Sequence, residues 1–265
     1  MKLPVVKANG NQNSFILIEK PFSDFKLNAQ EIINLCKIDN NIVDGLIIIE
    51  KINFENFKVD YFNNDGTWET LCINSLRCVG LMVFKKYNLK NFLAQCGDGN
   101  HLVEIIDQNN VRVSMNPPEY RSKEIEIDGI RGFYIFAGAK HFVINYKHEW
   151  PSNSRLEKIA KKIRYNKIFK NGINVNFYKN NDNNIDVITY EKGIEKIMPS
   201  CASGSFACAY HHIFHNNLKN KDIYITNIVG ELFAYIDLTK GEFFMSGPAE
   251  IEYEKELKFE LGKKL

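Results

Sequence analysis

The sequence of 265 residues contains no apolar run that approaches the ~18 residues needed for a membrane-spanning helix. Its first seven residues, MKLPVVK, also lack the apolar core of a secretory signal peptide. These two absences predict a cytoplasmic protein that has no membrane partner.

An excess of charge of one sign is also missing. The 34 Lys and Arg residues are nearly balanced by 32 Asp and Glu residues, and the two signs alternate along the chain. A nucleic-acid-binding protein needs a basic stripe to neutralise phosphates, so we expect no nucleic-acid partner. The six cysteines are too sparse for a disulfide scaffold, which favours free thiols in a reducing compartment.

What remains is an ordinary globular composition, with 45% hydrophobic and 25% charged residues. The length suffices for two domains of about 130 residues each. Two stretches, 69–78 and 199–208, resemble each other: each has a cysteine, then small or polar residues, then an apolar helical pattern. The spacing is 127 residues between Gly66 and Gly193, 129 between Cys72 and Cys201, and 130 between Met115 and Met245. This nearly constant shift predicts two halves of one architecture.

Hydrophobic periodicity predicts an α+β fold of two pseudo-symmetric domains, each a curved, mainly antiparallel sheet wrapped around a central helix, with the active site in the interdomain cleft. The first domain is expected over 1–116, completed by 250–265, and the second over 117–249. The expected strands are 15–19, 45–50, 57–62, 92–96, 102–106, 111–115, 132–136, 142–146, 174–178, 185–190, 223–226, 232–236 and 242–245, with an alternating tail over 249–253.

Four helices are expected. Asn28 and Glu31 have the spacing of a capping box at the start of a helix over 28–37. The central helix after Cys72 has a regular apolar pattern, and Gly80 would let another element approach closely. The other two helices would bury Leu156, Ile159, Ala160 and Ile163, and Phe206, Ala209, Tyr210 and Ile213.

A cysteine at a helix N-terminus has a pKa below the usual value of about 8.5, because unpaired backbone N–H groups favour the thiolate. Two such thiols on either side of a substrate could take a proton from one face of a carbon and return one to the other face. That exchange inverts a stereocentre. The charge that moves onto a substrate carboxylate would be stabilised by the backbone N–H groups of Ile73, Asn74, Ala202 and Ser203.

Several motifs resemble those of the diaminopimelate epimerase family, whose members interconvert LL- and meso-diaminopimelate with two cysteines and no cofactor. The first cysteine motif is similar to C-G-N-G-x-R-C and the second to A-C-G-S-G. The stretches NSF (13–15), NNDG (63–66), IR (163–164), NVNF (174–177), EKG (191–193) and MSGPA (245–249) are similar to further family motifs, and His141 matches the histidine of N-P-H.

The resemblance implies an isomerase of lysine and peptidoglycan precursor biosynthesis whose partner is a small-molecule amino-acid substrate, diaminopimelate. It needs no cofactor and no metal, and it could form a homodimer. Cys72 and Cys201 would be the catalytic thiols, and His141 and Glu191 would assist at the reacting amino group. The implied substrate-binding residues are Asn13, Asn63, Ile73, Asn74, Asn174, Glu191, Lys192, Ala202 and Ser203, with Asn63, Asn174 and Lys192 at the far end of the substrate.

The sequence departs from the family pattern at particular positions. Ile73, Ser75 and Ala202 stand where the family has glycines, Ala139 replaces the asparagine of N-P-H, and Lys192 replaces an arginine. The loop from Gly193 to Cys201 is one residue longer than the family pattern. A lysine cannot bind a carboxylate in a bidentate manner, so a racemase or epimerase of another amino acid is the alternative enzyme.

Two further alternatives belong to other classes. Ile73 is compatible with a non-catalytic amino-acid-binding relative. A metalloenzyme would use the helically spaced Cys208, His211, His212 and His215, although packed or exposed histidines explain this pattern better. The remaining cysteines, Cys36, Cys78, Cys96 and Cys208, are expected to be small core residues.

Overall fold

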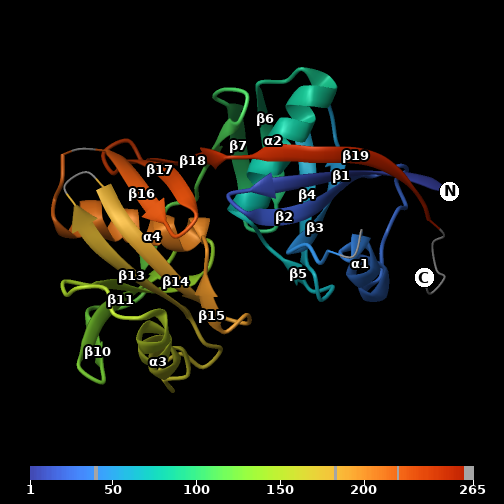
Figure 1. The fold of residues 1–265 in the computed structure, drawn as a ribbon. Coiled ribbons are helices and arrows are strands. Elements are labelled where there is room, and N and C mark those ends of the chain that lie inside the picture. Colours follow the sequence, from blue (N-terminus) through green and yellow to red (C-terminus); the bar gives the residue numbers. More distant parts are fainter. Residues whose placement is uncertain (39–40, 182–183, 220, 260–265) are drawn as a thin grey trace. The chain divides into compact units, whose positions relative to one another are not determined.

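The computed structural model describes residues 1–38, 41–181, 184–219 and 221–259 (Figure 1). The chain divides into two compact units, of which the first contains Met1–Ser114 and the segment that starts at Ser246. The second is the continuous segment Met115–Met245. Among the described residues, each unit combines a mixed sheet with two α-helices, which confirms the predicted α+β, two-domain fold class. Residues 260–265 of the expected first domain lie outside the described part.

The first unit contains a single curved sheet. Its strand order is β19-β1-β2-β3-β4-β6-β7-β8, in which only β2–β3 and β4–β6 are parallel, and β5 pairs with β4. The strands are β1 (Lys2–Gly10), β2 (Asn13–Glu19), β3 (Gly45–Lys51), β4 (Asn56–Asn63), β5 (Trp68–Glu69), β6 (Asn91–Cys96), β7 (Gly99–Ile105), β8 (Asn110–Ser114) and β19 (Glu250–Lys258).

Helix α2 (Ile73–Tyr87) is the central helix of this unit (Figure 1). It contacts β1, β2 and β19 near one end of the strand order and β7 and β8 at the other end, so the sheet curves around it. A Cβ atom on Gly80 would lie 2.8 Å from a methyl group of Val111 and 3.0 Å from one of Val103. This confirms that Gly80 allows β7 and β8 to approach the helix closely.

Helix α1 (Ala29–Leu35) begins with the predicted capping box. The Asn28 side chain accepts a hydrogen bond from the Glu31 amide at 3.0 Å, and the Glu31 carboxylate accepts one from the Asn28 amide at 2.7 Å. Ile32 and Leu35 of α1 belong to a hydrophobic cluster with Leu3 and other strand residues. The helix ends two residues earlier than predicted.

Strand β1 was not predicted. Its sequence, KLPVVKANG, interrupts the alternation of apolar and polar residues with a proline and a lysine, so a local pattern is hard to recognise. Besides its hairpin partner β2, the strand pairs over most of its length with β19 from the other end of the sequence, where Lys7 and Glu252 form an ion pair of 2.9 Å. Such a non-local pairing is invisible to a window of neighbouring residues.

The second unit repeats this topology. Its strand order is β9-β11-β12-β13-β14-β16-β17, with β12–β13 and β14–β16 parallel, while β10 pairs with β11 and β15 with β14. The strands are β9 (Glu119–Tyr120), β10 (Ile125–Ile127), β11 (Ile130–Phe136), β12 (Lys140–Asn145), β13 (Asn174–Asn181), β14 (Asn184–Glu191), β15 (Lys196–Met198), β16 (Asp222–Asn227) and β17 (Gly230–Asp237), and β18 (Glu242–Pro248) continues from this unit into the first.

The helices of the second unit occupy the same places in the chain order as those of the first. Helix α3 (Asn153–Arg164) lies between the parallel strands β12 and β13 and buries Leu156, Ala160 and Ile163. The central helix α4 (Ala202–His215) follows the short strand β15 and contacts β12, β13, β14, β16 and β17. The repeat indicated by the sequence therefore has a structural counterpart in strand order and helix placement.

The six cysteines, all within the described part of the chain, form no disulfides with one another. Cys36, Cys78 and Cys208 are buried, as predicted, whereas Cys96 is only half-buried because it ends β6 at a hairpin turn. Among the described helices, none is long and apolar enough to cross a membrane.

Candidate active site

Cys72 and Cys201 occupy equivalent positions in the two units. Each immediately precedes the central helix of its unit and has an extended backbone, with φ −135° and ψ 109° at Cys72 and φ −140° and ψ 105° at Cys201. The carbonyl of each accepts the first helical hydrogen bond, from Leu76 at 3.0 Å and from Ser205 at 2.9 Å. Both cysteines are half-buried. The structure thus places both thiols at helix starts, as the sequence predicts.

The first turn of each helix is suited to a negative charge. Ile73 and Asn74 begin α2, Ala202 and Ser203 begin α4, and neither first turn contains an acidic residue. The N–H groups of a first turn have no partner within the helix, and the helix dipole adds a partial positive charge there. Each helix start can therefore stabilise a thiolate or bind a carboxylate.

The start of α2 is anchored by asparagine side chains. The Asn74 amide donates to the Asn13 side-chain oxygen at 2.5 Å, and the Asn13 amide donates to the Asp44 carboxylate at 3.3 Å. Asp44 also accepts the backbone N–H of Ser14 at 2.8 Å. A Cβ on Gly10 would overlap the Asn74 carbonyl, so β1 lies directly against the helix start. Asn13 and Asn74 are therefore brought together.

Asn63 is placed differently from Asn13 and Asn74. It is the last residue of β4, opposite Gly45 on β3, and its amide donates to the Thr67 hydroxyl at 3.0 Å. Gly66 has a φ of +86° in the same turn, and a Cβ there would overlap Ala29. The described contacts of the Asn63 side chain stay within its own turn.

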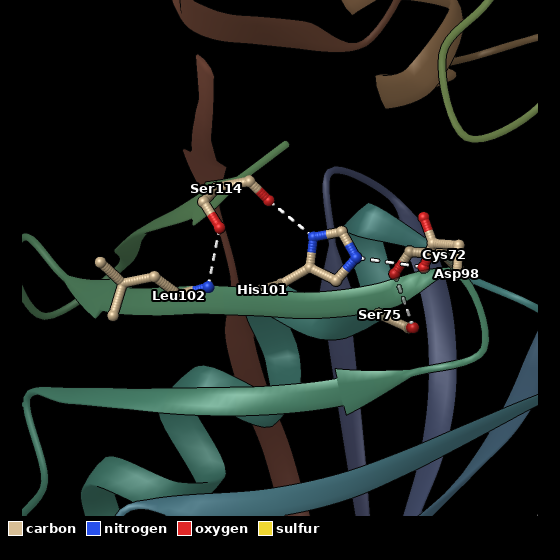
Figure 2. A network of polar contacts seen from close by, with 6 residues as sticks. All are labelled: Cys72, Ser75, Asp98, His101, Leu102 and Ser114. Atoms are coloured by element: carbon tan, nitrogen blue, oxygen red, sulfur yellow. Dashed lines mark hydrogen bonds and ion pairs between the residues drawn. The ribbon is translucent and has the colours of Figure 1, made fainter. Parts of the chain in front are cut away.

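The hairpin between β6 and β7 also touches the segment before Cys72. The amide of Gly97 in this hairpin donates to the Thr70 carbonyl at 2.9 Å. Figure 2 shows the network that follows: the buried His101 ring lies 2.7 Å from the Ser114 carbonyl and 3.1 Å from the Asp98 carboxylate. Burial lowers the pKa of His101, but hydrogen bonds to Asp98 and Ser114 and the charge of Asp98 outweigh this and raise it overall.

In the second unit, Cys201 begins a chain of neutral hydrogen-bonding groups. Its sulfur lies 3.7 Å from the Ser203 hydroxyl, which lies 3.1 Å from Nε2 of His141. The Asn176 amide lies 3.1 Å from Nδ1 of His141, and Asn176 accepts a hydrogen bond from Thr189 at 2.9 Å. Burial lowers the pKa of His141 to about 3, although Asn176 opposes this shift. His141 is therefore a neutral imidazole.

The network determines which nitrogen of His141 carries the proton. Because the Asn176 amide donates to Nδ1, the ring proton lies on Nε2 and is donated to the Ser203 hydroxyl. The hydroxyl hydrogen of Ser203 is then directed to the Cys201 sulfur. In this arrangement His141 acts on Cys201 through Ser203.

The other predicted residues of this unit lie at the ends of β13 and β14. Asn174 is the register partner of His141, and its side-chain oxygen accepts the Lys192 amide at 2.8 Å. Glu191 is the last residue of β14 and half-buried, while Lys192 is exposed. His141, Asn174 and Lys192 are thus connected through adjacent strands.

The hairpin between β16 and β17 holds the segment before Cys201. Asn227 is buried, and its side-chain oxygen accepts hydrogen bonds from Ser200 at 3.0 Å and from Ser205 at 3.3 Å. Its amide donates to the Val187 carbonyl at 3.4 Å. The equivalent hairpins of the two units therefore both fix the residues that flank a cysteine.

The histidines of α4 take part in an aromatic cluster. His211 and His212 are buried, and Nδ1 of His211 lies 2.7 Å from the Tyr120 hydroxyl. The rings of His211 and His215 are stacked, with centroids 4.9 Å apart. Within the described part of the chain, no group of three or more His, Cys, Asp or Glu residues is placed to hold a metal ion.

Sequence reasoning missed several groups that surround the cysteines. Asn176 and Arg77 lie within motifs that were recognised, but their individual roles have no signal in a single sequence. Asp98 and His101 carry no motif at all. The missed residues are Asp44, Arg77, Asp98, His101, Asn176, Thr189 and Asn227.

Known proteins resemble this chain over nearly its full length, although no protein-family model matches it. The diaminopimelate epimerase of Hydrogenobaculum sp. is 29% identical over 275 residues, covering 97% of this chain and 99% of the relative. That of Flavobacterium psychrophilum is 30% identical over 264 residues, covering 95% of this chain and 99% of the relative. The crystal structure of a hydroxyproline epimerase from Agrobacterium vitis has the same fold, with a TM-score of 0.70 at 10% identity, covering 97% and 91% of the two chains. The chain therefore belongs to the diaminopimelate epimerase family of isomerases.

Proposed function

We propose that this amino-acid epimerase converts LL-diaminopimelate to meso-diaminopimelate without a cofactor, with Cys72 and Cys201 as its two acid–base groups. The observation that carries the proposal is the equivalence of these residues: each is a half-buried thiol with the same extended backbone at the start of a central helix. The names of the relatives supply the substrate. The product would enter lysine and peptidoglycan biosynthesis.

The reaction needs one thiolate and one thiol. The thiolate sulfur takes the α-proton, and the electron pair left on the carbon is delocalised onto the substrate carboxylate. The other thiol then gives its proton to the opposite face of the carbon, which inverts the stereocentre. At the end the two cysteines have exchanged protonation states, so proton exchange with solvent must restore the first state.

The N–H groups at the helix starts would stabilise the intermediate. Those of Ile73, Asn74, Ala202 and Ser203 can donate to the carboxylate as its charge increases, and the loss of one such donor typically costs about 10²–10³ in rate. Glu191 and His141 would assist at the amino group, and His141 would also orient the Ser203 hydroxyl toward Cys201. Asn13, Asn63, Asn174 and Lys192 would bind the remainder of the substrate.

The second candidate function keeps the thiol chemistry but changes the amino acid. Lys192 stands where the family has an arginine, and Ala139 stands where it has an asparagine. A lysine binds a carboxylate as a point charge, whereas an arginine forms two parallel hydrogen bonds. Both differences lie in the part that would contact the far end of diaminopimelate.

Isotope exchange separates these candidates. The purified protein is incubated in D₂O with LL-diaminopimelate or with one of a panel of other amino acids, and α-deuterium is measured by mass spectrometry. We expect deuterium in diaminopimelate together with the appearance of the meso form. Deuterium in another amino acid alone would establish the second candidate, and a protein that binds amino acids without any exchange would be a non-catalytic relative.

A further inference from the structure

The turn between β14 and β15, residues 192–195, follows directly on Glu191 and begins with Lys192. Glu191 still belongs to the strand ladder, where it is the register partner of Lys196. Within the turn, Gly193 and Glu195 have left-handed backbones, with φ of +94° and +59°, and the Glu195 amide donates to the Glu191 carbonyl at 2.8 Å. The left-handed region is unfavourable for a residue with a side chain, so contacts from the surroundings must hold Glu195 there.

The Glu195 carboxylate accepts hydrogen bonds from the turn and from outside it. The Gly193 amide donates to Oε1 at 3.0 Å, and the Tyr190 hydroxyl donates to Oε2 at 3.1 Å. Arg164 is the last residue of α3, and its Nε donates to Oε1 at 3.0 Å while its Nη2 lies 2.9 Å from the same oxygen. The carboxylate therefore connects the turn to the end of α3.

Arg164 and Glu195 form an ion pair that is largely shielded from water. Their side chains are 14% and 27% exposed. Burial alone would raise the pKa of Glu195, but hydrogen bonds, first among them that from the Gly193 amide, and the charge of Arg164 lower it overall. Glu195 is thus ionised at neutral pH, and a charge-assisted contact of this kind is stronger than one between neutral groups.

Arg164 also contacts the segment that leads into β13. Gly172 has a φ of +67°, and a Cβ there would lie 1.4 Å from Nη1 of Arg164, so only a glycine leaves room for the guanidinium. Strand β13 begins two residues later with Asn174, whose side-chain oxygen accepts the Lys192 amide at 2.8 Å. The guanidinium therefore contacts both the segment before Asn174 and the turn that contains Lys192.

This turn lies where the sequence departs from the family pattern. The loop from Gly193 to Cys201 is one residue longer, and Lys192 stands in place of an arginine. A longer loop has more conformations to lose, and ordering it when a ligand binds costs affinity. Contacts that order the turn in the free protein remove this cost.

We propose that Arg164 and Glu195 are positioning residues: their ion pair fixes the turn so that Lys192 and Asn174 are already in place for the far end of the substrate. Neither residue has to touch the substrate. Glu191 is held by the strand ladder, so the pair should affect binding more than the chemical step. This inference deepens the proposed function and rests on it for the roles of Lys192 and Asn174.

Two measurements on the full-length protein test the proposal. Amide hydrogen exchange with mass spectrometry reports the order of residues 191–198, and steady-state kinetics give KM and kcat for LL-diaminopimelate. The variants are Glu195→Gln, which keeps the shape and removes the charge, Arg164→Met, and the double variant. Glu126→Gln is the matched control, because Glu126 of the same unit pairs with Arg131 at 3.0 Å but both side chains are exposed.

In Glu195→Gln we expect exchange in residues 191–198 to be about tenfold faster, because hydrogen bonds to a charged group are lost, while exchange in α4 stays as in the parent. KM should rise about tenfold and kcat should change less than about twofold, since a disordered turn weakens the binding of substrate and transition state alike. Arg164→Met should do the same, and the double variant little more, because the two residues act as a unit. Glu126→Gln should match the parent in both measurements.

Unchanged exchange in Glu195→Gln would overturn the proposal, and so would faster exchange with the KM of the parent. A loss in kcat as large as that in kcat/KM would contradict a role in positioning for binding. If Arg164→Met does not fold, Glu195→Gln decides, because the glutamine has nearly the same shape as the glutamate.

The two measurements also separate this proposal from the proposed function. If the parent epimerises another amino acid, the kinetics are measured with that substrate. If the parent turns over no amino acid, the proposed function is refuted, and amide exchange alone decides whether Arg164 and Glu195 fix the turn.

Discussion

Helices α2 and α4 begin in the same way but differ in the polar groups around their first turns. Near the start of α2, the chain places the buried cation Arg77, and the hairpin that holds the preceding segment contains the Asp98–His101 pair. Around the start of α4, the described hydrogen-bonding groups are neutral, because burial lowers the pKa of His141 and keeps its imidazole uncharged. The groups described near Cys72 thus include charged side chains, whereas those described near Cys201 are neutral and polar.

The difference shows that a repeated backbone does not imply repeated electrostatics. Equivalent positions carry Arg77 and Phe206 on the two helices, and His101 and Leu232 on the third residues of β7 and β17. The topology determines where each thiol lies, whereas a few buried side chains determine which polar groups lie near it. Two cysteines at equivalent helix starts therefore have different polar neighbours.

The largest expected effect comes from removing either cysteine. Cys72→Ala and Cys201→Ala should each lower the rate of epimerisation by about 10²–10⁴, because in the proposed mechanism each thiol acts as a general acid or base on one face of the carbon. The rate is measured by the formation of the meso product. Cys96→Ala is the control, since Cys96 is a half-buried thiol of the same unit as Cys72 and its pKa is raised to about 12 by burial, Asp98 and Asp60.

If only one of the two variants were slower than the parent protein, only that cysteine would act as an acid–base group. The comparison of the two helices would then concern one catalytic and one structural cysteine.

The next effect concerns the third residue after each cysteine, Gly204 in α4 and Ser75 in α2. A Cβ on Gly204 would overlap the side chain of Asn176, so Gly204→Ala should displace it and lower the free energy of unfolding by about 1–3 kcal/mol. Ser75→Ala removes only a hydrogen bond of 2.9 Å to the Cys72 carbonyl and should cost about 1 kcal/mol or less. Urea unfolding measures both.

If Gly204→Ala and Ser75→Ala lowered the free energy of unfolding by the same amount, the Asn176 side chain would have more room at Gly204 than the close contact indicates. Fluorescence can assign each transition to a unit, because Trp68 belongs to the first unit and Trp150 to the second.

A smaller effect should appear as a pH dependence that is confined to the first unit. The pKa of His101 is raised in the folded protein, so its contribution to stability is fully present below the ordinary value of about 6.5 and is lost as the pH rises through the folded pKa. His101→Gln should therefore lower the free energy of unfolding by about 1 kcal/mol near pH 5.5, and by less near pH 8.5. Urea unfolding at the two pH values measures the difference.

Trp68 is a suitable probe for this experiment in a Trp150→Phe background, because its ring lies against Gly97 in the same hairpin. Asp98→Asn should flatten the same pH dependence. A cost of His101→Gln that is greater at high pH would contradict the raised pKa.

The smallest effect is expected at Lys192, beyond the end of β14. If Lys192 binds the far end of diaminopimelate as proposed, Lys192→Arg introduces a guanidinium that can bind a carboxylate with two hydrogen bonds, so KM for diaminopimelate should fall about fivefold while kcat changes little. Steady-state kinetics check this, with Lys158→Arg on α3 as the control. A better KM for another amino acid instead of diaminopimelate would favour the second candidate substrate.

Local signals in the sequence were sufficient for much of the fold. The capping box of Asn28 and Glu31, the close approach at Gly80 and the buried face of α4 all follow from side chains within a few residues of one another. The cysteines were identified because each is followed by small residues and a helical pattern. Periodicity detects such short-range features, and repeat spacing detects internally repeated ones.

Most polar groups near the cysteines could not be predicted, because they belong to parts of the chain that are distant in the sequence. Asp44 reaches the start of α2 through Asn13, and His101 is fixed by Ser114 at the end of another strand. Arg77 looks like an ordinary charged residue in the sequence, and only the structure shows that it is completely buried. Hydrogen-bond partners and burial are properties of the assembled units.

The pairing of β1 with β19 has a consequence for the order of events during synthesis. The second unit is continuous, so it is complete once Met245 has emerged from the ribosome, and it can fold while the chain is still growing. The first unit must wait for its last strand, although its residues are made first. Until then β1 has an unpaired edge, where premature association with another nascent chain is a hazard.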